Sequence, residues 1–396
     1  MPASLVHPPE PAAGRHLALV ATCCAMLVFA LSSAILPAAL LRAAGELHVD
    51  VATLTRVVAT QFGAFFLSTL IGGMLSDRYG KPVVLQVGCL LTAAGALVWV
   101  GARQMAAAHV AALLLGMGGG ILESIGSALL ADLYPERRKF ALNVTQVAYC
   151  AGAAVGPAIM SILLPQGVSW RMFFAGEAVL GLMLLALYRA TPAPRTVLLE
   201  TSGWRELVQP LRSPSVRLLA LALFGYVLAE SGLGIGAAVY LQVQHHAPER
   251  WAILGITLIW VGMLVGRMIC AALPETLSTE RLVAGLATAG AVVLAAQGAV
   301  TDWRVSFVLF GLAGLIFSGI WPLIVALCVS RQPQRSGAAV GLVIAAGALG
   351  VIAAPMIMAA LLQRGQARLI FPLYALALLI TAVAVRLPRA QTRHNS

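Results

Sequence analysis

The chain has 396 residues, of which 60% are hydrophobic and only 10% are charged, and its formal net charge is +11. A soluble domain carries about 25% charged residues, so this composition indicates an integral membrane protein. The positive charge is then explained by basic loops on one side of a membrane, and not by nucleic-acid binding.

Twelve apolar segments, each near the roughly 20 residues that a helix needs to cross a bilayer, follow one another along the chain. The first is long for a signal peptide and no polar mature segment follows it, so we expect it to be retained as a helix. No segment shows the alternating pattern of a β-barrel strand. The segments lie at 17–41, 53–76, 83–101, 107–131, 140–164, 170–189, 216–242, 251–272, 282–300, 304–329, 337–362 and 368–387.

One long polar connection, rich in proline and charge, divides these segments six and six. The two halves share short patterns, such as residues 116–121 and 311–316. We therefore expect an all-α membrane protein whose twelve transmembrane helices form two pseudo-symmetric six-helix bundles, as a rocking transporter requires. The expected units are a cytoplasmic tail at 1–16, a first bundle at 17–190, a cytoplasmic loop at 191–215, a second bundle at 216–387 and a cytoplasmic tail at 388–396.

The distribution of basic residues predicts the orientation in the membrane. If the N-terminus is inside, 17 Arg and Lys residues fall on the inner side and 7 on the outer side, with Arg56 and Arg267 left within or at the edge of spans. Because basic residues collect in cytoplasmic loops, we expect both termini in the cytoplasm of a multi-pass inner-membrane protein.

A glycine-rich and charged stretch, Gly72 to Pro82, separates the second and third segments. Its glycines permit a sharp turn and a close approach of helices. The pattern Gly73-x-x-x-Asp77-Arg78-x-Gly80-Lys81 resembles the loop signature of major facilitator superfamily transporters between their second and third helices; the other interpretation is an ordinary charged connector of another membrane protein. We take the gating motif to be Gly73, Asp77, Arg78, Gly80, Lys81 and Arg138.

We expect Asp77 to act as a switch within this motif. Its carboxylate is placed to face the positive N-terminal end of a neighbouring helix near Gly337. That contact is expected to stabilise the outward-facing state and to be released when the bundles rotate inward.

Three carboxylates stand inside predicted spans, where hydrocarbon disfavours charge: Glu123, Glu177 and Glu230. A protonatable group in this setting is the default candidate for ion coupling. Glu123 shares a small-residue helix face with Gly116, so it lines either a water-filled cavity or a packed seam. The alternatives are structural hydrogen bonds for Glu123 and Glu230, and for Glu177 an ion pair with Arg171 near the outer interface.

Polar and aromatic side chains within the spans supply candidate substrate contacts. Asn143, Gln146 and Tyr149 recur at helical spacing, and they either serve a neutral hydroxyl-rich molecule or join helices to one another. Aromatic rings near Glu230 are suited to stacking on the apolar face of a sugar, or else they pack in the core. The candidates are Asn143, Gln146, Tyr149, Tyr226, Tyr240, Trp260 and Trp321, while the roles of Glu177, Arg56 and Arg267 stay open.

The tenth segment contains Trp321-Pro322 near its middle. Proline in a helix interior removes a hydrogen bond and frees backbone carbonyls. We expect a helix break there, with the freed carbonyls facing a cavity.

Several segments narrow the family resemblance. The stretches from Glu123 to Pro157, from Tyr226 to Glu230 and from Trp260 to Arg267 resemble helices of the fucose/galactose/glucose proton symporter branch. In that branch a first-helix Asp and a fourth-helix Glu serve proton coupling and sugar recognition. Glu123 matches the Glu, and Ser33 stands where the Asp is expected, so the resemblance adds Ser33 to the substrate contacts. We hypothesise that Glu230, in the pseudo-equivalent helix of the second half, takes over part of the missing acid's role beside Glu123.

The chain contains no phosphate-cradling loop of the Walker type, no HExxH pattern and no catalytic triad arrangement. We therefore expect a transporter and not an enzyme, without a cofactor and driven by a proton gradient. The expected function is symport of a sugar or similar polyhydroxylated solute with protons, by a monomer in the lipid bilayer with no nucleic-acid partner. The alternatives are an efflux antiporter for apolar drugs or metabolites, favoured by an antiporter-like pattern at Gly152 to Pro157, and a non-transporting receptor of the same fold.

Overall fold

The structure is a computed structural model that describes residues 12–134, 136–191, 209–274, 276–332 and 336–387. All regular structure among these residues is helical, which confirms the all-α expectation. The longer helices are α1 (Ala12–Glu46), α2 (Val51–Tyr79), α3 (Lys81–Gly101), α4 (Met105–Leu133), α5 (Arg138–Leu163), α6 (Arg171–Ala190), α8 (Pro214–His245), α9 (Glu249–Ala271), α10 (Thr279–Gln297), α11 (Trp303–Phe317), α12 (Ile320–Arg331), α13 (Ser336–Gln363) and α14 (Ile370–Arg386), and the short ones are η1 (Gln209–Arg212) and η3 (Ala367–Leu369).

Twelve segments of the described chain are long and apolar enough to span a membrane, as the sequence predicts. The first helix differs at its start, because α1 begins at Ala12 and so includes residues expected in the N-terminal tail. The predicted connection at 191–215 and the predicted tail at 388–396 lie mostly or wholly outside the described residues.

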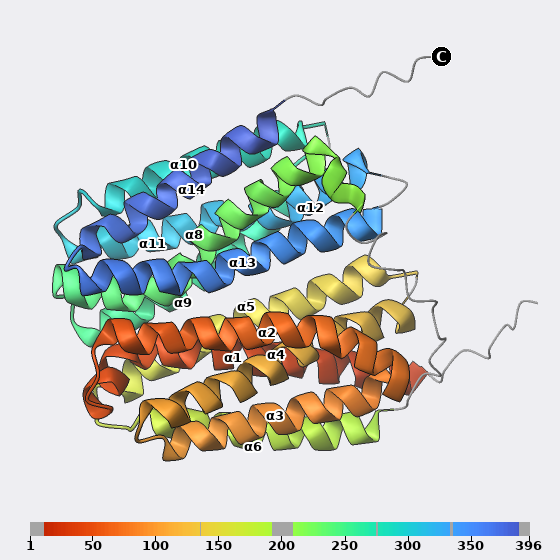
Figure 1. The fold of residues 1–396 in the computed structure, drawn as a ribbon, viewed down its shortest axis with the longest axis horizontal. Helices are drawn as coiled ribbons and strands as arrows, with labels where there is room; N and C mark the ends of the chain where they lie inside the picture. Colours follow the sequence, from red (N-terminus) through yellow and green to blue (C-terminus); the bar gives the residue numbers. More distant parts are fainter. Residues whose placement is uncertain (1–11, 135, 192–208, 275, 333–335, 388–396) are drawn as a thin grey trace, which may run out of the picture.

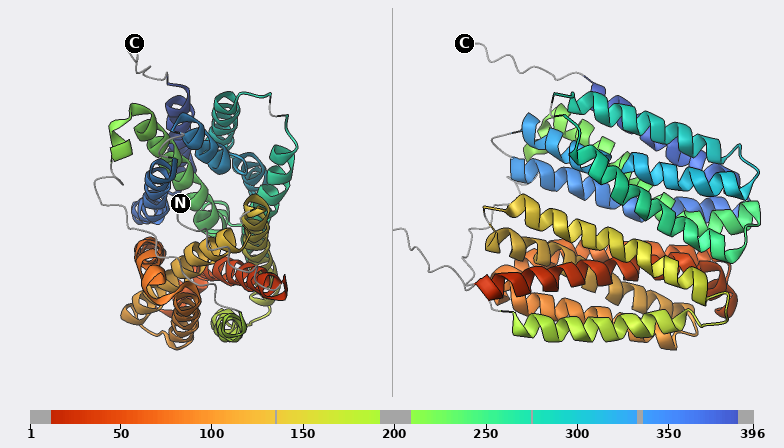
Figure 2. Two further views of the ribbon diagram at one scale, coloured as in Figure 1. Left: turned by 90° about the vertical axis from the view of Figure 1, so that its right-hand side faces the viewer. Right: turned by 180° about the vertical axis from the view of Figure 1, so that it is seen from behind.

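The helices form two bundles lying side by side, α1 to α6 and α8 to α14 (Figures 1 and 2). We call the end that holds the start of α1, the turn at Tyr79–Lys81 and the end of α14 the motif end, which is on the right in Figure 1. The opposite end, which holds Glu46 and Glu249, is the distal end. Helices α2 and α13 lie side by side at the boundary, whereas α10 and α14 form the outermost layer of the second bundle (Figure 1).

The turn between α2 and α3 follows from its residues. Helix α2 is capped at its start by Asp50, whose carboxylate accepts a 2.7 Å hydrogen bond from the backbone N–H of Thr53. It ends at Gly80, which has φ +85°, a conformation that favours glycine. Pro82 in the first turn of α3 lacks the N–H that would have no partner there. The sharp hinge predicted at this glycine is therefore present.

Glycines on α4 let it pack directly against α2. A Cβ atom at Gly116 would lie 2.0 Å from the backbone oxygen of Gln61, and one at Gly120 would lie 2.4 Å from that of Phe65. Such contact brings helix backbones together and favours association within a membrane. The small-residue face of the fourth span is thus a packed seam over these turns.

The tenth span is broken into α11 and α12, as expected from its proline, but the break lies at Ser318–Gly319. Pro322 falls in the first turn of α12, where proline is tolerated. At Gly319 a Cβ atom would lie 2.6 Å from the sulfur of Cys270, so the close approach of α9 also requires glycine here.

Among the described residues, the buried hydrophobic core is continuous between the bundles at the distal end and not at the motif end. One cluster of buried residues contains much of the second bundle together with distal parts of the first, including Leu36, Val57, Leu115 and Phe174. A separate cluster fills the motif end of the first bundle, with Leu85, Leu122 and Tyr188 among its members. The two bundles therefore pack against each other mainly through their distal halves.

Candidate functional site

Tyr149 of α5 occupies the boundary between the bundles. Its ring lies 5.4 Å, centroid to centroid, from that of Trp260 on α9 in an edge-on arrangement, and 5.6 Å from that of Phe29 on α1. Phe29 in turn stacks on Phe65 of α2 at 5.0 Å. These four rings form an aromatic row that crosses from the first bundle to the second.

Two carboxylates, one from each bundle, lie near this row. The phenol of Tyr149 interacts electrostatically with Glu123 of α4 and with Glu230 of α8, and Ser33 of α1 lies within hydrogen-bonding reach of it. Both glutamates and Ser33 are half-buried, so each remains partly accessible to water. We call Glu123, Tyr149 and Glu230, with Ser33 and Trp260, the central cluster.

Arg267 adds a positive charge on the side of the second bundle. Its guanidinium interacts electrostatically with Glu230 and with Cys150, which follows Tyr149 on α5. The sequence left the role of Arg267 open, because a long arginine side chain at this position can extend to the inner membrane–water interface. In the structure Arg267 is half-buried and its charge acts on Glu230, although no ion pair between the two is present among the described residues.

Tyr226 and Tyr240, proposed as substrate contacts, lie inside the second bundle. Both are fully buried, at 0% and 1% exposure. The hydroxyl of Tyr226 donates to the backbone oxygen of Phe317 at 3.0 Å, and that of Tyr240 donates to the oxygen of Gln297 at 2.7 Å. Tyr226 still lies within hydrogen-bonding reach of Glu230, but Tyr240 is remote from the central cluster among the rings of the second bundle's core. The structure favours the packing alternative for both.

The remaining candidates for substrate contact are less closely connected to the central cluster. Gln146 is half-buried one helical turn from Tyr149 on α5, and Asn143 is exposed one turn further along. Trp321 is 38% exposed at the start of α12. No ring contact or hydrogen bond among the described residues joins Asn143 or Trp321 to the central cluster, so their assignment remains a prediction.

Glu177 of α6 does not pair with Arg171, and this alternative was wrong. Arg171 forms an ion pair with Glu46, and its Nη2 donates to the backbone oxygen of Ala102 at 2.9 Å. Glu177 is 1% exposed, and neither carboxylate oxygen has a hydrogen-bond partner among the described residues. Ser32 of α1 lies within hydrogen-bonding reach of it. No ring contact, hydrogen bond or ion pair among the described residues joins Glu177 to the central cluster.

The gating motif is described only in part. Lys81 forms an ion pair with Asp132 at the end of α4, while Arg78 is exposed and lies over the ring of Tyr79 at 5.2 Å. A Cβ atom at Gly73 would meet nothing within 4 Å, so no close helix approach is seen there. The side chains of Asp77 and Arg138 lie outside the described part of the chain, and the switch expected at Asp77 and Gly337 remains a prediction.

Direct polar contacts between the bundles occur at and near the distal end. Arg42 on α1 forms a two-pronged ion pair with Glu249 on α9, with N–O distances of 2.5 and 2.6 Å. Deeper in the boundary, the hydroxyl of Thr257 on α9 donates to the backbone oxygen of Ala154 on α5 at 2.9 Å. These contacts close the distal side of the boundary above the central cluster.

The aromatic row contains two residues that sequence reasoning missed, Phe29 and Phe65. Both are ordinary apolar residues of their spans, and nothing in the local pattern separates them from lipid-facing phenylalanines. Only the pairing of α1 with α2 and α5 reveals them. Among the described residues, no group of three His, Cys, Asp or Glu side chains is arranged to hold a metal ion.

Two six-span bundles that share a polar centre and are closed at one end define the architecture of a secondary transporter. The family model of the Major Facilitator Superfamily matches residues 18–296. The chain belongs to the Major Facilitator Superfamily, which confirms the resemblance seen in the motif between α2 and α3.

The fold is similar to that of two solved sugar transporters. For the D-xylose-proton symporter the TM-score is 0.76, with 15% identity over 95% of this chain and 98% of that one. For the fucose:proton symporter of E. coli it is 0.66, with 16% identity over 93% and 97% of the two chains. At these identities the likeness establishes the shared fold. In sequence, the chain is 28% identical over 200 residues to multidrug resistance protein MdtH of Shigella dysenteriae serotype 1 (strain Sd197), covering 48% of this chain and 49% of that protein.

Proposed function

We propose that this transporter carries a small polyhydroxylated solute, such as a sugar, together with a proton. The observation that carries the proposal is the position of Tyr149, which interacts with one carboxylate from each bundle. A group that exchanges a proton between the two halves of an alternating-access protein must sit at such a boundary. Glu123 and Glu230 are partly accessible to water, and this accessibility supports their role in proton exchange.

The residues of the central cluster also suit a sugar. The rings of Trp260, Tyr149 and Phe29 offer apolar faces, and the hydroxyls and carboxylates beside them accept from or donate to sugar hydroxyls. The names of the two structural neighbours, symporters of fucose and of D-xylose with protons, point the same way. We further propose that the protein works as a monomer in the inner membrane with both termini in the cytoplasm, as the basic residues indicate.

Within the cluster, Glu123 and Glu230 have different surroundings. Arg267 lies near Glu230, so loss of the proton from Glu230 is compensated by a fixed positive charge. No such cation is described near Glu123, whose electrostatic neighbour is the phenol of Tyr149. We assign Glu230 the role of a charge that stays in place through part of the cycle, and Glu123 the role of the group that releases its proton inward.

The test uses purified protein in liposomes, with fucose or D-xylose added and external pH recorded. Inward symport makes the external medium more alkaline when sugar is added. Glu123→Gln is expected to reduce sugar-driven alkalinisation at least about tenfold, since it removes the group that releases the proton. Glu230→Gln is expected to reduce it by a similar factor, since it leaves the charge of Arg267 uncompensated. Glu136→Gln, which removes an exposed carboxylate at the motif end, is the control and should transport normally. Unchanged proton movement in both glutamine variants would refute the proposed coupling.

A second function, export of apolar drugs or metabolites against protons, is favoured by the pattern at Gly152 to Pro157 and by the partial match to MdtH. The direction of proton movement separates the two functions. An exporter that exchanges drug for protons acidifies the compartment from which a symporter withdraws protons. The same liposomes, given a lipophilic cation in place of sugar, therefore distinguish the two by the sign of the pH change.

A further inference from the structure

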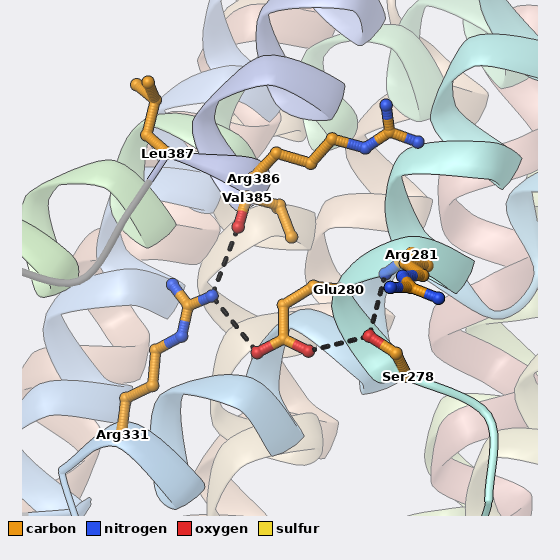
Figure 3. A pocket seen from close by; sticks show the side chains of 7 residues that line it. All are labelled: Ser278, Glu280, Arg281, Arg331, Val385, Arg386 and Leu387. Carbon is orange, nitrogen blue, oxygen red and sulfur yellow. Dashed lines mark hydrogen bonds and ion pairs between the residues drawn. The ribbon is translucent and has the colours of Figure 1, made fainter.

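A cavity of about 600 Å³ lies at the motif end of the second bundle, remote from the central cluster. It opens where α10 begins and where α12 and α14 end (Figure 3). Three guanidinium groups line it, from Arg281, Arg331 and Arg386, against one carboxylate, from Glu280. One carboxylate does not balance three guanidinium groups, so the arginines repel one another, and a bound anion would reduce this repulsion.

Arg331 forms the innermost part of the basic lining of the cavity. Arg331 is 7% exposed in its side chain; its Nη2 donates to the backbone oxygen of Val385 at 3.1 Å and lies 3.4 Å from Glu280. Its Nε is buried and has no hydrogen-bond partner among the described residues. Because Nε is buried, a ligand in the cavity would interact with Arg331 through its positive charge and not through this atom.

The other two arginines present their charge at the rim. Arg281 and Arg386 are exposed, and neither side chain has a hydrogen bond or ion pair among the described residues. In Figure 3 they lie on one side of the cavity and Arg331 lies on the other, with Glu280 between them. Each guanidinium carries N–H donors in a fixed fork that matches the oxygens of a phosphate.

A separate apolar groove lies further along the same two outer helices, α10 and α14. Helices α10 and α14 form the outermost layer, and a second cavity of about 310 Å³ lies between them, lined by Val292, Ala295, Leu376 and Leu379 among others. Val292 is 64% exposed and Leu376 is 54% exposed. From Glu280 to Val292 the helix rises about 18 Å, which is near the roughly 15 Å of hydrocarbon in one leaflet.

We propose that this basic cavity binds the phosphate head group of an anionic phospholipid, with an acyl chain lying in the groove between α10 and α14. The three arginines recognise the phosphate, and the apolar groove distinguishes a lipid from a free phosphate ester. The cavity lies at the ends of three membrane spans, which is the depth of the head groups. The proposal does not depend on the transported solute.

The test is a titration of detergent-purified full-length protein with phosphatidylglycerol or phosphatidylcholine, followed by native mass spectrometry. Arg281→Gln with Arg386→Gln is expected to weaken phosphatidylglycerol binding about thirtyfold, which corresponds to ~1 kcal/mol for each basic residue near the head groups. Arg331 is left unchanged because its burial makes misfolding a risk. The matched control is Arg212→Gln with Arg217→Gln, two exposed arginines at the same end of the bundle but outside the cavity.

A second pair of variants tests the acyl chain. Leu379→Asp places a charge in the groove, within the depth of one leaflet from Arg386, and is expected to reduce phosphatidylglycerol binding at least fivefold. Val308→Asp, on an exposed face of α11, should not reduce it. Equal losses in the cavity and control arginine variants, or equal binding of phosphatidylcholine, would show that the cavity is not a site for anionic lipid. If glycerol phosphate binds as tightly as phosphatidylglycerol and Leu379→Asp changes nothing, the occupant is a free phosphate ester and the lipid assignment is refuted.

Discussion

The two ends of this transporter differ in how the bundles are joined. At the distal end the core is shared between bundles, and Arg42 and Glu249 link α1 to α9. At the motif end, every polar side-chain contact described for the helix ends stays within one bundle, as for Lys81 with Asp132 and Arg331 with Glu280. The first kind of contact must break when the bundles rock apart, whereas the second kind moves with its bundle. The structure therefore corresponds to a state whose distal side is closed.

This difference separates contacts that set the conformational equilibrium from contacts that only stabilise a bundle. A contact shifts an equilibrium by the difference in its free energy between the two states. Cross-bundle contacts at the distal end exist in one state only, so their removal should change the populations. Contacts within a bundle exist in both states, so their removal should change stability alone.

Reversing the charge of Arg42 is expected to give the largest effect. Arg42→Glu replaces a two-pronged ion pair by two facing carboxylates, and it should shift the equilibrium toward a distal-open state about thirtyfold, or ~2 kcal/mol. The side chains of Arg42 and Glu249 are 35% and 25% exposed, so solvent screening keeps the effect at this size. Distances between spin labels at positions 103 and 250, exposed at the distal ends of the two bundles, measure the shift.

The control for this variant is the charge swap Arg42→Glu with Glu249→Arg. It restores an attractive pair in the same place and should return the spin-label distances toward those of the native protein. If the single reversal leaves the distances unchanged, the ion pair does not contribute to closure, and the contrast between the two ends rests on apolar packing alone.

Removing the ring of Trp260 tests how far the packing between the bundles extends from the distal end. Trp260 contacts Tyr149 across the boundary, and an aromatic pair contributes about 1 kcal/mol beyond the area that it buries. Trp260→Ala should therefore shift the populations toward the distal-open state about fivefold in the same spin-label measurement. Trp251→Ala is the matched control on α9, because its ring packs on Trp303 and Phe307 of its own bundle. Equal shifts in Trp260→Ala and Trp251→Ala would mean that the packing between the bundles ends on the distal side of Trp260.

Removing the cap of α2 should lower stability without changing the populations. Asp50→Ala deletes a hydrogen bond that exists within one helix, at a cost of about 1 kcal/mol. Hydrogen bonds from the side chain and backbone of Thr53 lower the pKa of Asp50 below its ordinary value of 3.8. The stabilisation by the ionised cap is therefore present above pH 3.8 and is lost as the pH falls through the lowered pKa.

The comparison variant for this cap is Asp50→Asn, whose side-chain oxygen still accepts the hydrogen bond but does not titrate. Thermal unfolding in detergent should show native-like stability for Asp50→Asn near pH 7 and a weaker loss of stability below about pH 4. A steeper loss in Asp50→Asn than in the native protein would contradict the assignment of the acid-sensitive step to this carboxyl group.

The sequence predicted the spans and the turn at Gly80, and it singled out Glu123, Glu230 and Tyr149, which the structure places near one another. Apolar length, glycine and charge within a span each leave a local pattern. It did not predict which faces of the helices meet. Tyr226 and Tyr240 share helix α8 with Glu230, yet their hydroxyls bind backbone carbonyls inside the second bundle. Phe29 and Arg267 join the site only because α1, α5, α8 and α9 converge. Such convergence is a property of packing between distant segments, which periodicity within one segment does not contain.

Breaking the ion pair of Lys81 and Asp132 should have the smallest effect and gives the sharpest contrast with Arg42. Both residues belong to the first bundle, and the side chain of Asp132 is 54% exposed, so water screens the attraction. Asp132→Asn should lower the free energy of unfolding by less than about 0.5 kcal/mol, and the spin-label distances at the distal end should not change. A shift as large as that of Arg42→Glu would mean that this pair also differs between states, since a contact present equally in both cannot move the equilibrium. The motif end would then have to contain a cross-bundle link that involves α4, and the distal end would no longer be the sole place where the bundles are held together.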